Sequence, residues 1–345
     1  MRMQAVILAG GFGTRLRPLT YTRSKSLLPI LNKPMISYLV EALPEEVNRV
    51  IIAANYKKEQ IEDFFERNRF GKEIIINEEP KPLGTGGAVK FAERYIDDRF
   101  LVLNSDIISS IDFDEMIGFH EKKGAFVTIS LWPVENVSEF GVVRIERDGR
   151  ITEFVEKPKP EEAPSNLINA GAYCMEKDAL DYIDEPNRLI SMEQEVFPRI
   201  IEDGRRFYGY QIRGFWIDVG RISSYIEVNR ILLRMHNKRF MVGDNCMIKG
   251  DLEETSAGSN VEVGDGSRIR CAVILDNVKI GRNVWIENSV IGEGCIVGDG
   301  ARIINCVIGD GEEIEGGRVL KDVRIWSKPI PEGYPDKQVG NIIKA

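Results

Sequence analysis

Residues 5–19 read AVILAGGFGTRLRPL, an apolar run followed at once by a loop rich in glycine and arginine. The run is typical of a buried strand, and glycines let the next turn bring backbone N–H groups close to an anion. Arg15 adds a planar guanidinium, and Lys25 a compact charge. The stretch predicts a phosphate-binding turn, although it lacks the third glycine of the dinucleotide fingerprint and the GxxxxGKS/T pattern. A purely structural turn is the alternative.

Strand-like and helix-like stretches alternate from residue 4 to about residue 220. Apolar runs at residues 5–8, 50–53 and 100–103 each leave room for a helix before the next run. This spacing is typical of βαβ units and predicts an α/β domain with a mainly parallel central sheet. A helix is also expected over residues 34–43, with a proline in its first turn.

A short repeat replaces the helical pattern after about residue 241. Aliphatic residues recur at steps of 6, 5 and 6, so that equivalent positions lie 17 residues apart. Three steps per coil, with glycine-rich corners, predict a three-sided parallel β-helix of about three coils. A set of irregular sandwich strands is the alternative, and the regular phase argues against it. The repeated positions are Val263, Ile269, Ile274, Ile280, Ile286, Ile291, Val297, Ile303, Ile308 and Ile314.

These two patterns divide the chain of 345 residues. We expect an α/β domain over residues 1–222, a linking helix within residues 223–240, and a β-helix with an extended C-terminal tail over residues 241–345. The proline-rich residues 327–335 belong to this tail, which we expect to lie along the solenoid. Cys271, Cys295 and Cys306 fall inside the coils and are expected to be small buried side chains.

Composition excludes several classes of function. The net charge of −8 argues against broad nucleic-acid binding, which needs a basic surface. No apolar stretch is long enough to span a membrane, and the first residues lack the pattern of an export signal. Five scattered cysteines form no disulfide framework or zinc motif, so a reducing cytoplasm is expected. His120 and His236 are expected on solvated helix surfaces.

The ordered motifs of the chain resemble those of the nucleoside-diphosphate-sugar pyrophosphorylases, which are sugar-1-phosphate nucleotidyltransferases. After the glycine-rich loop come PLGT, NSD, FGVV, FVEKP, NAG and WIDVG, which start at residues 82, 104, 140, 154, 169 and 216. The resemblance covers essentially the whole chain. It implies a Rossmann-like nucleotidyltransferase domain followed by a short left-handed β-helix. NSD, WIDVG and the segment MEQEVFP at residues 192–198 are most similar to the mannose-1-phosphate guanylyltransferases.

The resemblance implies that a sugar 1-phosphate attacks the α-phosphorus of a nucleoside triphosphate and that pyrophosphate leaves. Positioning and electrostatic stabilisation supply most of such catalysis. The implied catalytic residues are Arg15, Lys25, Asp106, Lys157 and Asp218. The implied nucleotide contacts are Leu8, Gly10, Gly11, Gly13, Thr14, Arg15, Lys25, Glu79, Gly84 and Thr85. The implied sugar-phosphate contacts are Gly141, Glu156, Lys157 and Asn169.

Two separated carboxylates are the candidates for a metal site. Asp106 and Asp218 each follow an apolar, strand-like stretch, and both match the family's metal carboxylates. Ligands gather at strand ends in open α/β sheets, and Mg²⁺ prefers a few oxygen ligands. We therefore expect Mg²⁺ as the cofactor. The alternative is that either residue caps a helix or a turn.

Glu79 is the candidate for reading the nucleobase, because the family reads the base near the segment before Gly84. Members that use uracil or thymine tend to carry glutamine there. A carboxylate only accepts hydrogen bonds, and guanine presents two neighbouring donors, so Glu79 favours GTP. The alternative is that Glu78 and Glu79 form a solvated acidic turn.

Two departures keep other nucleotides open. Ser24 and Ser26 flank Lys25 where many members have prolines, as in glucose-1-phosphate thymidylyltransferases, and Lys81 stands where guanylyltransferases usually have a glutamate. We expect GTP and mannose 1-phosphate as substrates, with a thymidylyl- or uridylyltransferase as the alternative.

Two further classes of function are alternatives. A β-helix acyltransferase usually needs a histidine as general base, and none follows His236. A catalytically silent regulatory subunit would have lost motif residues that are retained here. The open ends and flat faces of a solenoid suit subunit contacts, so a homo-oligomer formed through the β-helix is expected.

Overall fold

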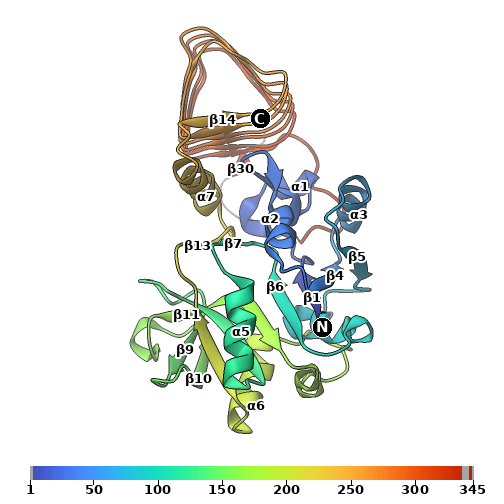
Figure 1. Cartoon of the computed structure of the whole chain (residues 1–345). Coiled ribbons are helices and arrows are strands. Elements are labelled where there is room, and N and C mark those ends of the chain that lie inside the picture. The colour runs from blue at the N-terminus through green and yellow to red at the C-terminus, as the bar shows by residue number, and fades with distance from the viewer. Residues whose placement is uncertain (1–2, 336–341, 344–345) are drawn as a thin grey trace. The chain divides into compact units, whose positions relative to one another are not determined.

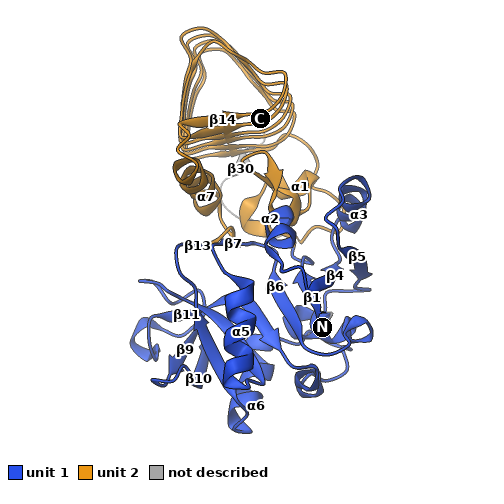
Figure 2. Ribbon diagram, viewed as in Figure 1, with its two compact units in different colours: residues 1–11, 36–216 blue, residues 12–35, 217–345 orange. Residues whose placement is uncertain are grey.

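The computed structural model describes residues 3–335 and 342–343 and separates the chain into two compact units. The first comprises residues up to Gly11 together with Ile36–Trp216, and the second comprises Phe12–Met35 and the residues from Ile217 onward (Figure 2). The packing therefore groups Phe12–Met35, which follow the first strand in sequence, with the repeat region. The three-part division by residue number stays a prediction.

The first unit is built on a mixed nine-stranded sheet of the described chain, in the order β10-β9-β11-β6-β1-β4-β5, with β8 paired to β11 and β12 paired to β8 (Figure 1). Strands β6, β1, β4 and β5 are parallel, and β11 pairs antiparallel with β6. The expected mainly parallel α/β sheet is confirmed. The strands are β1 (Met3–Leu8), β4 (Val47–Ala54), β5 (Glu73–Glu78), β6 (Phe100–Asn104), β8 (Val127–Pro133), β9 (Gly141–Ile145), β10 (Ile151–Glu156), β11 (Leu167–Met175) and β12 (Phe207–Gln211).

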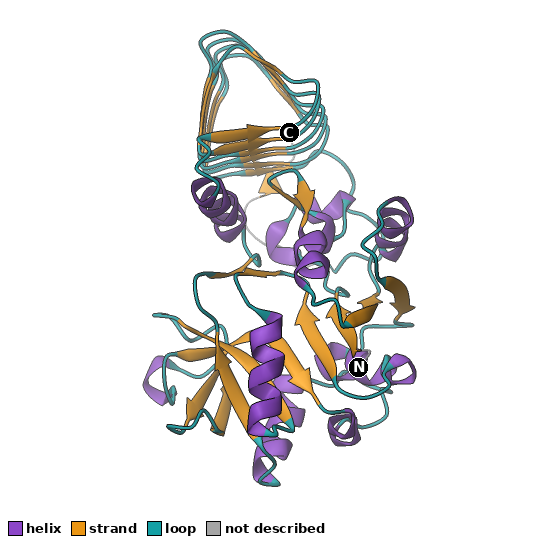
Figure 3. Ribbon diagram, in the orientation of Figure 1, coloured by secondary structure: helices purple, strands orange, loops and turns teal. Residues whose placement is uncertain are grey.

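Helices cover this sheet because its central strands are apolar on both faces. Val6 and Val102 belong to the main core, and Phe154, Tyr173 and Phe197 form an aromatic cluster with ring centroids 5.2–5.4 Å apart. The helices of the chain are α1 (Leu19–Thr22), α2 (Met35–Ala42), α3 (Lys58–Arg67), α4 (Gly84–Phe91), α5 (Phe113–Lys123), α6 (Phe197–Glu202) and α7 (Ile222–Met235) (Figure 3). The helix expected over residues 34–43 corresponds to α2, and the linking helix expected within residues 223–240 corresponds to α7.

His120 differs from its expected surface position. Its side chain is fully buried in α5, where Nδ1 lies 2.9 Å from Thr128 Oγ1 and Nε2 lies 3.0 Å from Glu176 Oε1. Burial lowers the pKa of His120 despite the neighbouring Glu176 carboxylate. The expectation was wrong because polar neighbours in sequence point to other sides of a helix. His236, at the end of α7, is exposed as expected.

The second unit contains a parallel β-helix whose coils have a triangular outline (Figure 3). All ten predicted aliphatic positions are buried, and each pairs with its equivalent one coil away, as Ile269 does with Ile286 and Ile286 with Ile303. The 17-residue repeat is therefore confirmed. One side consists of β14 (Phe240–Val242), β17 (Thr255–Ala257), β20 (Val273–Ile274), β23 (Val290–Ile291), β26 (Val307–Ile308), β29 (Arg324–Ile325) and β30 (Ile342–Ile343).

The other two sides have five strands each in the described chain. One consists of β15 (Met247–Ile248), β18 (Glu262–Val263), β21 (Lys279–Ile280), β24 (Ile296–Val297) and β27 (Glu313–Ile314). The other consists of β16 (Asp251–Glu253), β19 (Arg268–Arg270), β22 (Trp285–Glu287), β25 (Arg302–Ile304) and β28 (Val319–Lys321).

The solenoid is longer than the three coils visible in the sequence. Ile248 pairs with Val263, a step two residues shorter than the repeat, so this side of the first coil is out of phase, whereas Leu252 pairs with Ile269 at the full step of 17. At the other end, Leu320 and Ile325 extend the buried rows. Among the described residues, no helix is long and apolar enough to cross a membrane.

The cysteines of the coils divide into two kinds. Cys295 and Cys306 are fully buried, as expected, whereas Cys271 is half-buried. Cys271 adopts a positive φ of 49° and directs its Sγ toward Glu254 Oε2 at 3.4 Å. It therefore occupies a corner of the coil and not the inward row.

Candidate active site

The turn after β1 begins the set of predicted site residues in the first unit. The carbonyl of Leu8 accepts a hydrogen bond from Ser105 N at 3.2 Å, which joins this turn to the loop that carries Asp106. A Cβ atom placed on Gly10 would lie 3.2 Å from Glu79 Oε1, whereas Gly11 is exposed. The glycine at position 10 therefore lets the Glu79 carboxylate approach the main chain of the predicted phosphate turn.

Glu79 is a buried carboxylate, only 6% exposed, just beyond the end of β5. Its Oε2 accepts the backbone N–H of Leu83 at 3.1 Å, and its own carbonyl accepts Asn55 Nδ2 at 2.8 Å. Burial raises the pKa of Glu79, and the Leu83 hydrogen bond only partly opposes that rise. Glu78, by contrast, is exposed and pairs with Lys58, so the solvated acidic turn describes Glu78 alone.

The segment at Gly84 and Thr85 opens α4 and is tied to a π-helical turn, η6 (Met192–Val196). Thr85 Oγ1 donates to Glu193 Oε2 at 2.8 Å and accepts the N–H of Met192 at 2.9 Å. The hydroxyl of Thr85 thus links the predicted nucleotide segment to η6. Lys81 is exposed and donates to the carbonyl of Asn187 at 2.8 Å.

Gly141 and Glu156 lie opposite each other on β9 and β10. A Cβ on Gly141 would lie 2.9 Å from Glu156 Oε2, so glycine leaves this carboxylate room. Lys157 Nζ lies 3.3 Å from Glu156 Oε1, and the Lys157 side chain is 60% exposed. Burial raises the pKa of Glu156; Lys157 opposes that shift, and Glu193 adds to it. An acceptor and a cation therefore stand side by side, as a phosphorylated sugar requires.

Asn169 is held in one orientation by its neighbours on β11. Its Nδ2 donates to the Tyr173 hydroxyl at 2.9 Å, and its Oδ1 accepts the N–H of Gly171 at 3.1 Å. The Tyr173 hydroxyl donates in turn to Glu193 Oε1 at 3.3 Å. A Cβ on Gly171 would lie 2.6 Å from Asn104 Nδ2, which places Asn104 beside the same strand.

Four of these neighbours were not among the predicted site residues: Asn55, Asn104, Tyr173 and Glu193. Asn55 and Asn104 could have been found, because each stands at the carboxyl end of a parallel strand. Tyr173 offers no such signal, and Glu193 was marked only as part of the segment MEQEVFP. Tyr173 and Glu193 become part of the candidate site only because β11 and η6 fold beside each other.

Asp106 follows β6 in the tight turn that precedes β7 (Ile107–Ser109). It is half-buried, and the neighbouring Ser105 is fixed to the carbonyl of Leu8. β6 lies next to β1 in the sheet, with Asn104 opposite Leu8. The structure therefore places Asp106 at the same sheet edge as the turn that follows β1, as the strand-end argument predicts.

The second unit carries the remaining predicted residues. Gly13 has a φ of +64°, and a Cβ there would lie 2.8 Å from Thr20 Cγ2 and 3.2 Å from Lys25 Cβ, so only glycine fits. Thr14 and Arg15 follow in the 3₁₀ turn η1 (Thr14–Leu16), and Lys25 begins η2 (Lys25–Leu27). Gly13 and Lys25 are thus neighbours in space.

Asp218 ends β13 (Trp216–Asp218), the strand in which the chain passes from the first unit into the second. A Cβ placed on Gly220 would lie 2.6 Å from Arg15 Nη2 and 2.8 Å from Asp218 Oδ1. Gly220 therefore leaves room for a guanidinium and a carboxylate on one small patch of the second unit. In the described part of the chain, no group of three or more histidine, cysteine or acidic side chains could hold a metal ion by itself.

Two family models match the chain. The nucleotidyl transferase model matches residues 4–235, and the model of the GMPPB C-terminal domain matches residues 234–338. The chain is 37% identical over 314 residues to the probable mannose-1-phosphate guanylyltransferase 3 of Oryza sativa subsp. japonica, which covers 83% of this chain and 85% of that protein. It is 34% identical over 302 residues to the mannose-1-phosphate guanylyltransferase of Mycobacterium tuberculosis, with 83% of each chain covered.

Similarity to solved structures extends to the fold. A crystal structure of UDP-glucose pyrophosphorylase with UDP-glucose aligns with a TM-score of 0.60 and 26% identity, over 68% of this chain and all of that one. The structure of HddC from Yersinia pseudotuberculosis aligns with a TM-score of 0.56 and 28% identity, over 67% and 99%. The matched motifs, the α/β sheet and the solenoid lead to one conclusion: this chain belongs to the nucleotidyl transferase family and carries a C-terminal domain of the GMPPB type.

Proposed function

We propose that this chain transfers a nucleotidyl group from a nucleoside triphosphate to a sugar 1-phosphate. A phosphate oxygen of the sugar attacks the α-phosphorus, the bond from that phosphorus to the bridging oxygen breaks, and pyrophosphate leaves. Family membership supports the reaction, and Glu156 beside Lys157 supports the sugar 1-phosphate as acceptor. Arg15 and Lys25 supply the cations for the triphosphate.

GTP and mannose 1-phosphate are the proposed substrates, with GDP-mannose as the product. The observation that carries the choice of GTP is the buried Glu79 carboxylate beside Gly10. Its oxygens only accept hydrogen bonds, which suits the N1–H and amino group of guanine and leaves the O4 carbonyl of uracil or thymine unpaired. The names of relatives from rice and Mycobacterium tuberculosis support mannose as the sugar.

Mg²⁺ is the proposed cofactor. Asp106 and Asp218 would hold it, because hard divalent cations prefer carboxylate and phosphate oxygens and Mg²⁺ takes few protein ligands. When bound, the ion would neutralise charge on the phosphates. Arg15 would orient the triphosphate from the Gly220 patch, and Lys157 would hold the sugar phosphate next to the hydroxyl acceptor Glu156.

A substrate grid tests this proposal. The purified full chain is assayed with ATP, CTP, GTP, UTP and dTTP against the 1-phosphates of mannose, glucose and N-acetylglucosamine, and pyrophosphate release is measured with and without Mg²⁺. We expect the highest kcat/KM for GTP with mannose 1-phosphate. A preference for dTTP or UTP with glucose 1-phosphate would reject the substrate assignment alone. No turnover with any pair would reject the enzymatic function and favour a silent regulatory subunit.

Two further predictions accompany the function. We expect the reaction to take place in the cytoplasm. Homo-oligomer formation through the β-helix is tested by sedimentation of the full chain, and a monomer at assay concentration would reject it.

A further inference from the structure

The predicted triphosphate loop is attached to the end of the solenoid within the second unit. Arg324, on β29, donates from Nη1 to the carbonyls of Arg15 at 3.0 Å and Arg17 at 2.5 Å. Arg17 in turn donates to the carbonyl of Pro335. Residues more than 300 positions apart in sequence thus hold the same stretch of main chain.

Tyr334 makes the second attachment. Its hydroxyl donates to the carbonyl of Phe12 at 3.0 Å and lies 2.8 Å from Thr20 Oγ1, which itself donates to the carbonyl of Gly13 at 2.9 Å. The Tyr334 and Thr20 hydroxyls carry one proton each, so only two of these three oxygen–oxygen contacts are hydrogen bonds at any one time. The hydroxyls of Tyr334 and Thr20 together therefore hold the carbonyls of Phe12 and Gly13.

The ring of Tyr334 also contacts several neighbouring side chains. Its centroid lies 4.9 Å from that of Tyr21 and 5.8 Å from that of Phe12, and the Arg17 guanidinium lies over it at 4.5 Å. Trp326 also packs against the ring of Tyr21, with ring centroids 5.3 Å apart. Tyr334 is only 6% exposed, so the tail residue is part of a closed aromatic cluster. Aromatic contacts of this kind stabilise the fold beyond the contribution of buried apolar area.

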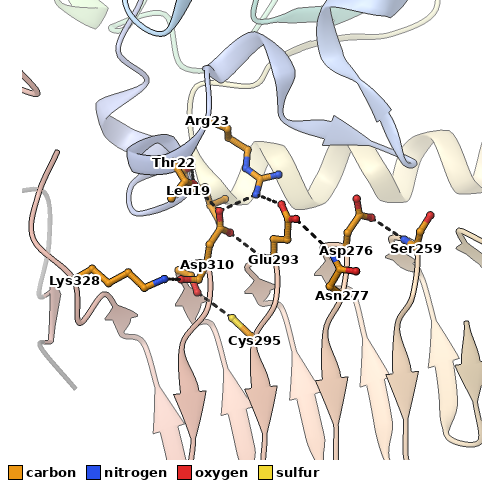
Figure 4. A network of polar contacts seen from close by, with 11 residues as sticks. Leu19, Thr22, Arg23, Ser259, Asp276, Asn277, Glu293, Cys295, Asp310 and Lys328 are labelled. Atoms are coloured by element: carbon orange, nitrogen blue, oxygen red, sulfur yellow. Dashed lines mark hydrogen bonds and ion pairs between the residues drawn. The ribbon is translucent and has the colours of Figure 1, made fainter. Parts of the chain in front are cut away.

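A ladder of acidic residues fixes the far end of the loop. Asp276, Glu293 and Asp310 stand 17 residues apart on successive coils, and Arg23 donates to Glu293 at 3.0 Å and to Asp310 at 2.8 Å (Figure 4). Thr22 also donates to Asp310, at 2.5 Å. Burial opposes the charge of Arg23, but the two carboxylates more than offset it and raise its pKa. The loop is thus held at both ends, before and after Arg15.

We propose that Tyr334 and Arg324 are positioning residues for the nucleoside triphosphate, acting through the main chain of residues 12–17. This inference rests on the proposed function. Neither residue needs to touch substrate. Their effect is to hold the loop from which Gly13, Arg15 and Lys25 meet the phosphates.

Peptide geometry explains how the effect is transmitted. The C=O and N–H of a trans peptide point in opposite directions within one plane. When Tyr334 holds the carbonyl of Phe12, it also fixes the direction of the Gly13 N–H, a predicted phosphate contact. Arg324 fixes the carbonyl of Arg15 in the same way and steadies the residue whose side chain reaches the Gly220 patch. Small errors in such positions are costly in phosphoryl chemistry.

Four variants of the full chain test this inference. Tyr334→Phe removes the hydroxyl and keeps the ring, whereas Tyr334→Ala removes both. Arg324→Lys keeps the charge but replaces the guanidinium, whose Nη1 donates to both carbonyls, with an ammonium on a shorter side chain. Ile330→Ala is the matched control, because Ile330 lies in the same tail and is 48% exposed. Steady-state kinetics are measured with each substrate varied in turn, and thermal unfolding is followed in parallel.

We expect Tyr334→Phe and Arg324→Lys to lower kcat/KM for the nucleoside triphosphate about five- to tenfold, with KM for the sugar 1-phosphate unchanged. Tyr334→Ala should lower it further, and Ile330→Ala should match wild type. Equal losses for both substrates, or losses that merely follow the unfolding temperature, would mean a structural role only and overturn the inference. Wild-type kinetics in Tyr334→Phe and Arg324→Lys would also overturn it. An inactive wild-type chain would instead reject the proposed function.

Discussion

The two units hold their candidate site residues by different means. In the first unit, Glu79 and Glu156 stand at strand ends and Asn169 lies within β11, and all three are fixed by hydrogen bonds or close contacts. In the second unit, Arg15 and Lys25 lie on a short loop whose carbonyls are held by the solenoid and its tail. The groups suited to the base and the sugar thus belong to the first unit, and the two cations suited to the triphosphate belong to the second. Substitutions should therefore separate the recognition of base and sugar from the binding of the triphosphate.

The largest expected effect is the loss of either metal carboxylate. Asp106→Asn, in the first unit, and Asp218→Asn, in the second, should each lower kcat about 10²- to 10³-fold, because the neutral amide weakens Mg²⁺ binding and leaves phosphate charge uncompensated. Turnover is measured over a range of Mg²⁺ concentrations, with circular dichroism as a check of folding. Asp265→Asn, at an exposed corner of the solenoid, is the control. Full activity in either variant would reject the metal assignment for that residue.

The next effect concerns the solenoid as a framework. Ile286 is fully buried between Ile269 and Ile303, so Ile286→Ala should cost about 2–5 kcal/mol of unfolding free energy by leaving a cavity. Ile296, which is 45% exposed on β24, provides the control, and Ile296→Ala should change stability by less than about 0.5 kcal/mol. Urea unfolding measures both. Equal stabilities would mean that the inward row contributes no more than the outer surface.

A smaller effect is expected at the sugar side. Lys157→Ala should raise KM for the sugar 1-phosphate about 10- to 100-fold, because a charge-assisted contact to the phosphate is lost. KM for the nucleoside triphosphate should stay the same. Lys159→Ala is the control, since Lys159 is an exposed lysine two residues along the same segment. If Lys157→Ala changed only the triphosphate KM, the division between the two units would be drawn wrongly.

The two units also differ in how much of their structure could be predicted from the sequence. In the solenoid, all ten positions predicted from the side-chain period are buried, because each coil repeats the same local environment. The period missed the first coil, where Ile248 is out of phase with the repeat. In the α/β unit, the strand end pointed to Asp106 and the family resemblance to Glu79, but the links from Thr85 and Tyr173 to Glu193 depend on tertiary packing with no period in sequence. The grouping of Phe12–Met35 with the solenoid is long-range for the same reason.

The smallest expected effect, a change of nucleotide preference, is also the sharpest probe of the first unit. Glu79→Gln should lower the preference for GTP over UTP and dTTP about tenfold, because an amide replaces a second acceptor with a donor. The Leu83 N–H can still donate to the remaining oxygen, so stability should hold. Glu78→Gln, at the exposed neighbour, is the control. Competition between GTP and UTP in one reaction gives the ratio directly.

The pH dependence of that ratio distinguishes a base-reading carboxylate from a merely buried one. Burial raises the pKa of Glu79, so its carboxylate takes up a proton at a higher pH than an ordinary glutamate does. Only the ionised form accepts both guanine donors. The GTP preference of the wild type should therefore fall as pH decreases through this raised pKa, and Glu79→Gln should show a flat, low ratio over the same range. A GTP preference that stays high at every pH in the wild type would show that guanine is recognised elsewhere. A protonated Glu79 carboxyl could not accept hydrogen bonds from both guanine donors.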